Sequence, residues 1–376
     1  MTATHDLKYM VHAIQLAQRG LYSTDPNPRV GCVIVRDGVI VGEGWHQQAG
    51  GPHAEIVALD DAGEQAKGAD VYVTLEPCSH HGRTPPCIDA LVRAGVSRVM
   101  MAMEDPNPLV SGAGRQALIQ AGVEVSVGAC RDMATALNPG FILRMTKQRP
   151  FVRCKLAMSM DGRTAMASGE SKWITGDAAR RDVQHLRARS SAILTGVGTV
   201  LADDPAMTVR PPGEADPKSE LRQPLRVIVD SQLRTSIQAT IFQQPGETLL
   251  ATILAEDKAQ RFTAIPKVSS VQLPAQNDRV DLSALLIYLA EREINEVLLE
   301  AGSTLCGAML QAELIDELVI YMAPHLMGDQ ARGLFSLLGL DAIAERISLD
   351  IKDIRAVGDD WRITATIKKQ LSVTSA

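Results

Sequence analysis

One histidine and two cysteines in the first quarter of the chain have the types and spacing of metal ligands. His53 is followed by Ala54 and Glu55, and Cys78 and Cys87 come later in the chain. One imidazole and two thiolates can hold a tetrahedral Zn²⁺ and leave a fourth position for water, as catalytic zinc sites do. Glu55 is then the candidate that moves protons for this water. The set predicts hydrolytic chemistry at a zinc site.

The alternative is a structural zinc site, which would require a fourth protein ligand. His46, His80 and His81 are close enough in sequence to supply one. The H-x-E pattern, followed by Pro77-Cys78 and then Cys87, favours the catalytic interpretation because it is the signature of zinc-dependent nucleobase deaminases.

Length, charge and cysteine usage limit the class of protein. A chain of 376 residues is long for one core, so we expect two domains. The net charge of −6 argues against a protein that coats nucleic acid. The first twenty residues lack the layout of a signal peptide, and no later stretch is apolar for the length of a membrane span. We therefore expect a cytoplasmic protein with reduced cysteines and no membrane partner.

Strand and helix patterns alternate in the first part of the chain, as they do in layered α/β domains. Apolar periodicity and terminal glycines predict helices over 6–19, 53–67, 87–94 and 115–121, and strands over 30–35, 39–41, 71–75, 99–102 and 123–127. His53 and Glu55 then open one helix and Cys87 opens another. Two helix N-termini near one point favour an anionic species there.

A junction is predicted between 138 and 150, after which the alternation restarts. Asn138-Pro139-Gly140 and the polar segment that ends at Pro150 carry the turn signals. Helices are then predicted over 177–189, 282–292 and 303–312, and strands over 151–158, 192–195, 225–229, 248–253, 268–273, 296–299, 318–322 and 361–367. The Pro-rich segment 211–223 is predicted to be a loop. We place the two α/β domains at 1–147 and 148–376.

Taken alone, the residues of the second domain offer only soft functional signals. Gly196-Val197-Gly198 follows a predicted strand but lacks the full dinucleotide fingerprint. The run Glu300-Ala301-Gly302-Ser303-Thr304 follows an apolar strand and opens a helix, an arrangement that can bind phosphate. A plain tight turn explains this run equally well, so both interpretations stay open.

The residues around the metal ligands resemble the pyrimidine deaminase of riboflavin biosynthesis. The resemblance lies in the segments 27–31, 53–55, 76–87 and 105–108 and in His46. The long gap between Cys78 and Cys87 differs from the C-x-x-C spacing of cytidine, tRNA-adenosine and DNA-editing deaminases. The family implies a cytidine-deaminase-like three-layer α/β domain with His53, Cys78 and Cys87 on zinc and Glu55 as the proton shuttle. The substrate contacts that it implies are Asn27, His46, His80, Asp105 and Asn107.

The second part of the chain resembles the reductase half of the same bifunctional family. The matching segments are 155–157, 161–163, 168–171, 173–176, 186–187, 196–199, 203–205, 208–210, 230–231 and 300–302, together with Ser159. The resemblance implies a dihydrofolate-reductase-like α/β fold that uses NADPH. The implied NADPH contacts are Ala157, Trp173, Thr199, Asp203, Ser231, Gly302, Ser303, Thr304, Leu305, Cys306, Gly307 and Ala308. The implied substrate contacts are Ser171, Arg187, Met207, Arg210 and Glu300. Asp203 would also orient groups or relay protons beside the reacting ribose. A place in the core is the alternative for Trp173.

The resemblance covers almost the whole chain and implies two activities. The first domain would remove the 2-amino group of a diaminopyrimidinone that bears a phosphoribosylamino group, releasing ammonia. The second would use NADPH to reduce the ribosyl group of the product to ribityl. We expect a small-molecule substrate and a homo-oligomer, either dimer or tetramer. Two alternatives remain: a nucleic-acid base deaminase with an accessory domain, and a non-catalytic binding module with a structural zinc site.

Overall fold

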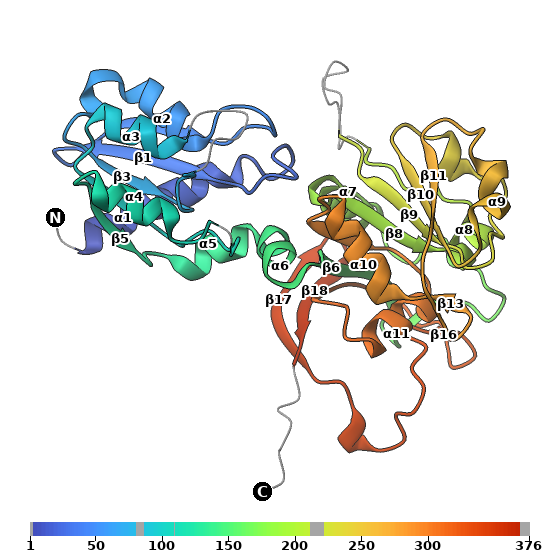
Figure 1. Ribbon diagram of the computed structural model, residues 1–376. Coiled ribbons are helices and arrows are strands. Elements are labelled where there is room, and N and C mark those ends of the chain that lie inside the picture. The colour runs from blue at the N-terminus through green and yellow to red at the C-terminus, as the bar shows by residue number, and fades with distance from the viewer. Residues whose placement is uncertain (1–2, 80–85, 109, 211–221, 369–376) are drawn as a thin grey trace, which may run out of the picture. The chain divides into compact units, whose positions relative to one another are not determined.

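The chain folds into two compact units, Met1–Arg149 and Pro150–Ala376, each with its own sheet (Figure 1). The computed structural model describes residues 3–79, 86–108, 110–210 and 222–368. None of the helices in these ranges combines the length and apolar character that crossing a lipid bilayer requires.

The first unit is built on a five-stranded sheet with the order β2-β1-β3-β4-β5. Strand β1 is antiparallel to β2 and β3, whereas β3, β4 and β5 run parallel to one another. The strands are β1 Gly31–Arg36, β2 Val39–Trp45, β3 Asp70–Val73, β4 Arg98–Met101 and β5 Glu124–Val127. The helices are α1 Ala3–Gln18, α2 Ala54–Ala62, α3 Cys87–Ala94, α4 Ala113–Gln120, α5 Arg131–Leu137 and α6 Pro139–Lys147.

Helices cover both faces of this sheet, which gives three layers. Along β1, Cys32 and Ile34 point to one face and Val33 and Val35 to the other, because side chains alternate along a strand. The first pair packs with buried residues of α2, α3 and α4, and the second pair with those of α1 and α5. The prediction of a three-layer α/β domain is thereby confirmed.

The second unit is built on a nine-stranded sheet with the order β11-β10-β9-β8-β14-β6-β15-β18-β17. The strands from β11 to β15 in this order are parallel, and β18 and β17 add an antiparallel edge. The strands of the sheet are β6 Phe151–Ser159, β8 Ala192–Gly196, β9 Leu225–Val229, β10 Thr248–Thr252, β11 Val268–Gln272, β14 Glu296–Leu299, β15 Glu317–Ala323, β17 Leu349–Val357 and β18 Asp360–Ile367.

Helices pack on both faces of this sheet as well. On one face, α10 (Leu282–Glu291) and α11 (Ser303–Gln311) cover β6 and β14. On the other, α7 (Asp177–Arg189) packs on β14 and β15, and α8 (Val197–Asp203) on β8 and β9. The remaining elements are α9 Glu256–Ala259 and two small sheets, β7 Arg163–Ala165 with β16 Arg332–Gly333, and β12 Ala275–Gln276 with β13 Arg279–Val280.

The structure adds elements that the sequence patterns do not predict. Helix α6 begins at Pro139, inside the segment interpreted as a turn, because proline is well suited to the first position of a helix. Strand β17 is exposed along most of its length. Because neither face is buried, its sequence does not alternate between apolar and polar residues, and this alternation is the pattern by which a half-buried strand is predicted. The predicted loop over 211–223 falls outside the described residues except at its last two positions.

Candidate functional site

The structure brings His53, Cys78 and Cys87 together in the first unit. His53 is the N-cap of α2, Cys87 is the first residue of α3, and Cys78 lies in the segment after β3. The His53 Nδ1 atom lies 3.2 Å from Cys87 Sγ and 3.5 Å from Cys78 Sγ. All three donor atoms lie within 4.8 Å of one another. One nitrogen and two sulfurs at this spacing can bind one tetrahedral ion, so the residues fit zinc.

The surroundings of the two sulfurs favour a thiolate at Cys78, whereas the hydrogen bond with Cys78 and burial raise the pKa of the Cys87 thiol. The backbone amide of Cys87, at the start of α3, donates a hydrogen bond to Cys78 Sγ over 3.3 Å. Hydrogen bonds from Cys87 and His53 lower the pKa of the Cys78 thiol, although burial opposes this. A thiolate is the form that binds metal.

His46 is engaged elsewhere and does not supply a fourth ligand. Its Nε2 atom lies 3.0 Å from Asn27 Nδ2, and its Nδ1 atom lies 2.9 Å from the carbonyl oxygen of Pro52. Its ring makes an edge contact with His53, with centroids 5.7 Å apart. Asn27 and His46 therefore belong to the surroundings of the ligand set. His80 and His81, the other candidates for a fourth ligand, lie outside the described residues.

Glu55 is in the first turn of α2, two residues after the ligand His53, and only 3% of it is exposed. Burial raises its pKa above the ordinary value, which is the change expected of a carboxylate that must both accept and donate a proton. The Glu55 carboxyl group lies close enough to His53 and Cys87 for both residues to influence its pKa.

Asp105 and Asn107 lie on a loop that Glu76 ties to the ligand segment. The carboxylate of Glu76 accepts hydrogen bonds from the backbone amides of Asp105 (2.9 Å), Gly112 (3.0 Å) and Arg115 (3.0 Å). The Asp105 carboxylate in turn accepts one from the amide of Asn107. The sequence patterns assign Glu76 no role; the signal that they offer is an acid two residues before the ligand Cys78, and only the structure shows that this acid is buried.

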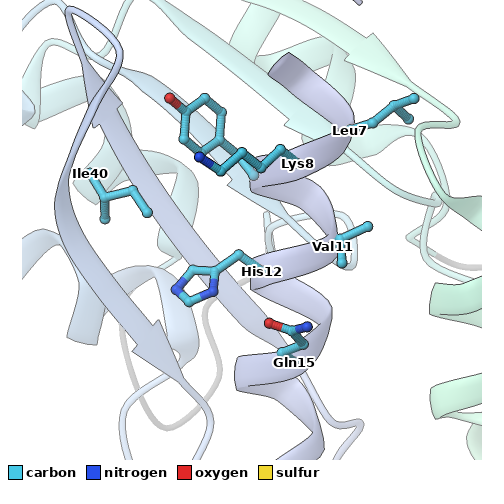
Figure 2. Close-up of a pocket in the computed structure, with 7 residues that line it drawn as sticks. Leu7, Lys8, Val11, His12, Gln15 and Ile40 are labelled. Carbon is cyan, nitrogen blue, oxygen red and sulfur yellow. The ribbon is translucent and has the colours of Figure 1, made fainter. Parts of the chain in front are cut away.

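A separate hollow, with a volume of about 460 Å³, lies beside α1 in the same unit. Figure 2 shows its lining along one face of α1 and at Ile40 on β2. His12, in this lining, contacts Glu43 at 2.7 Å. It contains no predicted site residue and no member of the ligand set, so it offers no support for either activity.

The second unit contains a cavity of about 1010 Å³ at the carboxyl ends of its parallel strands. Ligands of open α/β sheets bind at such edges. Segments that follow β8, β9 and β14 line it together with the end of β6. The predicted residues in the lining are Ala157, Ser171, Trp173, Arg187, Thr199, Asp203, Met207, Arg210, Ser231, Glu300, Gly302, Ser303, Thr304, Leu305 and Ala308.

The start of α11 has the features of a phosphate site. Gly302 is the N-cap of α11, and its amide donates to Thr199 Oγ1 over 3.2 Å. The first amides of a helix lack partners within the helix, and Ser303 and Thr304 at the start of α11 line the cavity. A cavity of this volume with a helix N-terminus in its wall fits a dinucleotide such as NADPH.

Two predicted cofactor contacts do not reach this cavity. Cys306 is fully buried in the core on the sheet side of α11. A Cβ atom on Gly307 would lie 2.2 Å from the carbonyl oxygen of Ser336, so Gly307 permits close packing instead. Residues on one helix face opposite directions, so only part of the run 302–308 lines the cavity.

Arg187 and Glu300 form an ion pair in the cavity wall, at 2.6 Å and 3.0 Å. Burial opposes ionisation of Glu300, but Arg187 and the neighbouring Lys155 keep its pKa below the ordinary value. Burial also lowers the pKa of Lys155, which lines the cavity and was assigned no role from sequence. Arg187 also donates to the carbonyl oxygen of Thr208.

The loop before α7 supplies a second group of side chains. Ser171 Oγ donates to Asp203 Oδ1 over 3.1 Å, and Lys172 Nζ donates to the Asp203 carbonyl oxygen over 2.7 Å. Trp173 is 69% exposed with the Arg180 guanidinium 4.6 Å from its ring centre. The alternative that places Trp173 in the core is therefore wrong.

Comparison with known proteins finds the same relatives for both units. Residues 3–103 match the cytidine and deoxycytidylate deaminase zinc-binding region, and residues 150–363 match the RibD C-terminal domain. The chain is 54% identical to the riboflavin biosynthesis protein RibD of Escherichia coli over 94% of this chain and 97% of that protein. It is 48% identical to RibD of Haemophilus influenzae, over 97% and 98%.

Solved structures extend this likeness to the fold. A structure of Acinetobacter baumannii RibD is 46% identical and matches with a TM-score of 0.89, covering 97% of this chain and 99% of that one. A Thermotoga maritima protein described as a diaminohydroxyphosphoribosylaminopyrimidine deaminase and 5-amino-6-(5-phosphoribosylamino)uracil reductase is 33% identical with a TM-score of 0.85, at the same coverage.

Proposed function

The chain belongs to the RibD family of bifunctional riboflavin biosynthesis proteins, and from this premise we propose which of its residues carry each activity. The protein is a zinc-dependent deaminase and an NADPH-dependent reductase of riboflavin biosynthesis. Deamination takes place in the domain 1–147 and reduction in the domain 148–376. The observation that carries the proposal is the convergence of His53, Cys78 and Cys87 beside buried Glu55.

In the first domain, His53, Cys78 and Cys87 hold zinc. When bound, zinc supplies a Lewis acid that makes water acidic near neutral pH. Glu55 accepts the proton of the attacking water and delivers it to the departing amine, so that water adds and ammonia leaves. Its burial supports this role, because a raised pKa helps the carboxyl group to hold the proton between the two steps.

Other residues of the first domain hold the pyrimidine. Asn27 and His46, which contact each other, and the loop with Asp105 and Asn107 supply hydrogen-bonding groups around the ligand set. His80 is proposed as a further contact on family resemblance alone. The substrate is the diaminopyrimidinone that bears a phosphoribosylamino group.

In the second domain, NADPH supplies the hydride that converts the ribosyl group to ribityl. Arg187 and Arg210 suit the substrate phosphate, because a guanidinium pairs with two phosphate oxygens. Ser171, Met207 and Glu300 complete the substrate contacts. Asp203, held by Ser171, orients the reacting ribose or relays a proton. Cofactor contacts come from Ala157, Trp173, Thr199, Asp203, Ser231 and the α11 residues that line the cavity.

The test is a coupled assay on the zinc-loaded protein that follows ammonia release and NADPH oxidation separately. Glu55→Gln should lower ammonia release about 10²–10⁴-fold, since general acid–base catalysis contributes about this much. Reduction of the already deaminated substrate should continue. Glu64→Gln, an exposed acid of the same unit, is the matched control.

The alternatives give different results in this assay. A nucleic-acid base deaminase would release ammonia from tRNA or single-stranded DNA but not from the free nucleotide. A non-catalytic zinc module would release none and would bind zinc equally well with Glu55→Gln. Ammonia release without NADPH oxidation would refute the role of the second domain.

We also infer a homodimer or tetramer in the cytoplasm. Strand β17 is a nine-residue edge strand with exposed apolar side chains, among them Ile351 and Ile354, and Trp361 on β18 is exposed beside it. An exposed edge of this kind supports pairing with a second copy. Free cysteines support a reducing compartment. Sedimentation analysis measures the oligomeric state, and a monomer at micromolar concentration would contradict the assembly.

A further inference from the structure

The short segment 207–210, which we call the substrate segment, contains two of the residues assigned to the substrate, Met207 and Arg210. It follows α8 and is part of no helix or strand. Its first three residues are nevertheless buried, with at most 7% of each exposed. Buried backbone groups need hydrogen-bond partners. Side chains from other segments therefore have to supply the partners that a neighbouring strand would otherwise provide.

Gln223 pairs with one edge of the substrate segment. The amide of Val209 donates to Gln223 Oε1 over 2.9 Å, and the carbonyl oxygen of Val209 accepts from Gln223 Nε2 over 3.1 Å. A glutamine side chain carries an N–H donor and a C=O acceptor, as a peptide group does. Gln223 therefore does for Val209 what the next strand does within a sheet.

Helix α7 pairs with the other edge through two side chains. Gln184 Oε1 accepts a hydrogen bond from the amide of Arg210 over 2.9 Å, and Arg187 donates to the carbonyl oxygen of Thr208 over 2.9 Å. Gln184 and Arg187 are three residues apart on α7, so they share one face of the helix. The hydrogen bonds of the segment alternate between Gln223 and α7, as those of an extended chain do. Gln184 thus fixes the backbone of Arg210 relative to Arg187.

The guanidinium group of Arg210 is available to a ligand, whereas that of Arg187 is engaged by Glu300 and Thr208. Arg210 is exposed and lines the cavity, and its guanidinium has no partner among the residues that the structure describes. Burial raises the pKa of Glu300, and the charge of Arg210 is among those that lower it, so this charge lies near the Arg187–Glu300 pair. Because the arginine side chain is long and flexible, the position of its backbone limits where the charge can reach.

We propose that Gln184 is a positioning residue of the reductase site, which acts through the backbone of Arg210 to place that guanidinium at the substrate phosphate. This rests on the proposed assignment of Arg210 to the phosphate. Gln184 lines the cavity and is only 8% exposed, so its side chain has little freedom to move away from the Arg210 amide. Without Gln184 this amide loses its partner, and the end of the substrate segment is no longer held on α7. A small displacement of a binding group is enough to weaken its contact with the substrate.

The experiment compares two substrates of the reductase, the deaminated phosphoribosyl compound and the same compound after a phosphatase has removed its phosphate. Gln184→Met has a side chain of similar length but lacks the acceptor. For the phosphorylated substrate it should lower kcat/KM about tenfold, mainly through KM, because a hydrogen bond to a charged group is weakened. For the dephosphorylated substrate kcat/KM should change less than threefold. Equal losses for both substrates would show a merely structural role and overturn the proposal.

A double-mutant cycle tests whether Gln184 acts through Arg210. Arg210→Ala alone should lower kcat/KM for the phosphorylated substrate, and the addition of Gln184→Met should lower it no further. Losses that add would overturn the proposal, because Gln184 would then act without Arg210. Gln184 Nε2, which has no partner in the described part of the chain, would be the atom that contacts the phosphate in that case.

Controls separate this proposal from the assignment on which it rests. Gln260→Met changes an exposed glutamine of the same unit outside the cavity and should leave both substrates unaffected. Gln184→Asn keeps a polar amide but is one methylene shorter, so it should reproduce the loss if Gln184→Met fails to fold. A wild type that reduces the phosphorylated and dephosphorylated substrates equally well would overturn the assignment of Arg210 to the phosphate, and this proposal with it.

Discussion

At the scale of single residues, the second site depends on a buried charge pair. Arg187 and Glu300 contact each other through two hydrogen bonds, and Lys155 lies near enough to influence the same carboxylate. A buried pair contributes to stability only while both members are charged, and removal of one partner leaves an uncompensated charge. The contribution of this pair to stability therefore depends on pH.

Glu300→Gln should lower the free energy of unfolding of the second unit by about 3–5 kcal/mol at pH 7, because the Arg187 charge loses its partner. The pKa of Glu300 is lowered from its ordinary value of 4.5, so the stabilisation is present above that value and is lost as the pH falls through the lowered pKa. The difference between wild type and variant should narrow below pH 4.5. Urea unfolding of both proteins at several pH values measures this difference in the free energy of unfolding.

The matched control is Glu313→Gln, which changes an exposed acid of the same unit. It should cost less than about 0.5 kcal/mol at every pH, as surface substitutions usually do. A difference for Glu300→Gln that does not narrow as the pH falls from 7 to well below 4.5 would show that the carboxylate charge is not what stabilises this site.

At the scale of elements, the zinc site depends on how closely α2 packs on the sheet. Gly44 on β2 has no side chain, which allows α2 to lie against this strand, and His53 and Glu55 are at the start of α2. A Cβ atom on Gly44 would lie 2.3 Å from the carbonyl oxygen of Ala54 and 2.5 Å from the amide nitrogen of Ala58. Backbone atoms cannot move aside as a side chain can, so a substitution must displace the helix.

Gly44→Ala should destabilise the first unit by about 1–3 kcal/mol, the usual cost of overpacking. It should also weaken zinc binding, because α2 holds the histidine ligand while α3 holds a cysteine. Competition with a chromogenic chelator measures the zinc affinity. Gly333→Ala, where the nearest atom is 3.9 Å away, should change neither quantity. Unchanged zinc affinity in Gly44→Ala would mean that the ligand set does not depend on the position of α2.

At the scale of the whole molecule, the two units have separate cores. The clusters of buried residues that contain α1 to α5 are distinct from those that contain α7 to α11. A ligand that binds only the native state stabilises the unit that holds it. Ligand binding at each site should therefore raise the unfolding temperature of the unit that contains the site, and not that of the other unit.

Calorimetry of the chelator-treated protein should show two unfolding transitions. Zn²⁺ should raise the temperature of one transition, and NADP⁺ should raise the other. Mg²⁺, which prefers oxygen ligands, should raise neither and is the control for ionic strength. A single transition that both ligands shift equally would contradict the independence of the two units.

Much of the first site is determined by sequence alone, because its elements are local. Cys87 begins α3 directly after Pro86, and Gly95 ends the helix in a left-handed conformation. Such caps are set by residues a few positions apart, so the helix and the position of its ligand were predictable. The ligand types likewise indicated zinc without any coordinates. The match to known proteins confirmed the two activities that the motifs implied.

The tertiary structure decided what depends on distant segments. Glu76 organises a loop 29 to 39 residues away, and the hairpin of Arg279 reaches Ser231 from 49 residues away. The resemblance implies Cys306 and Gly307 as cofactor contacts, but the rotation of α11 places Cys306 in the core and Gly307 against the backbone of Ser336. Local propensity extends over a few residues, whereas strand order and helix rotation depend on the packing of the whole unit. For that reason the sequence alone predicted the two reactions, whereas the fold decided which of the predicted side chains line each site.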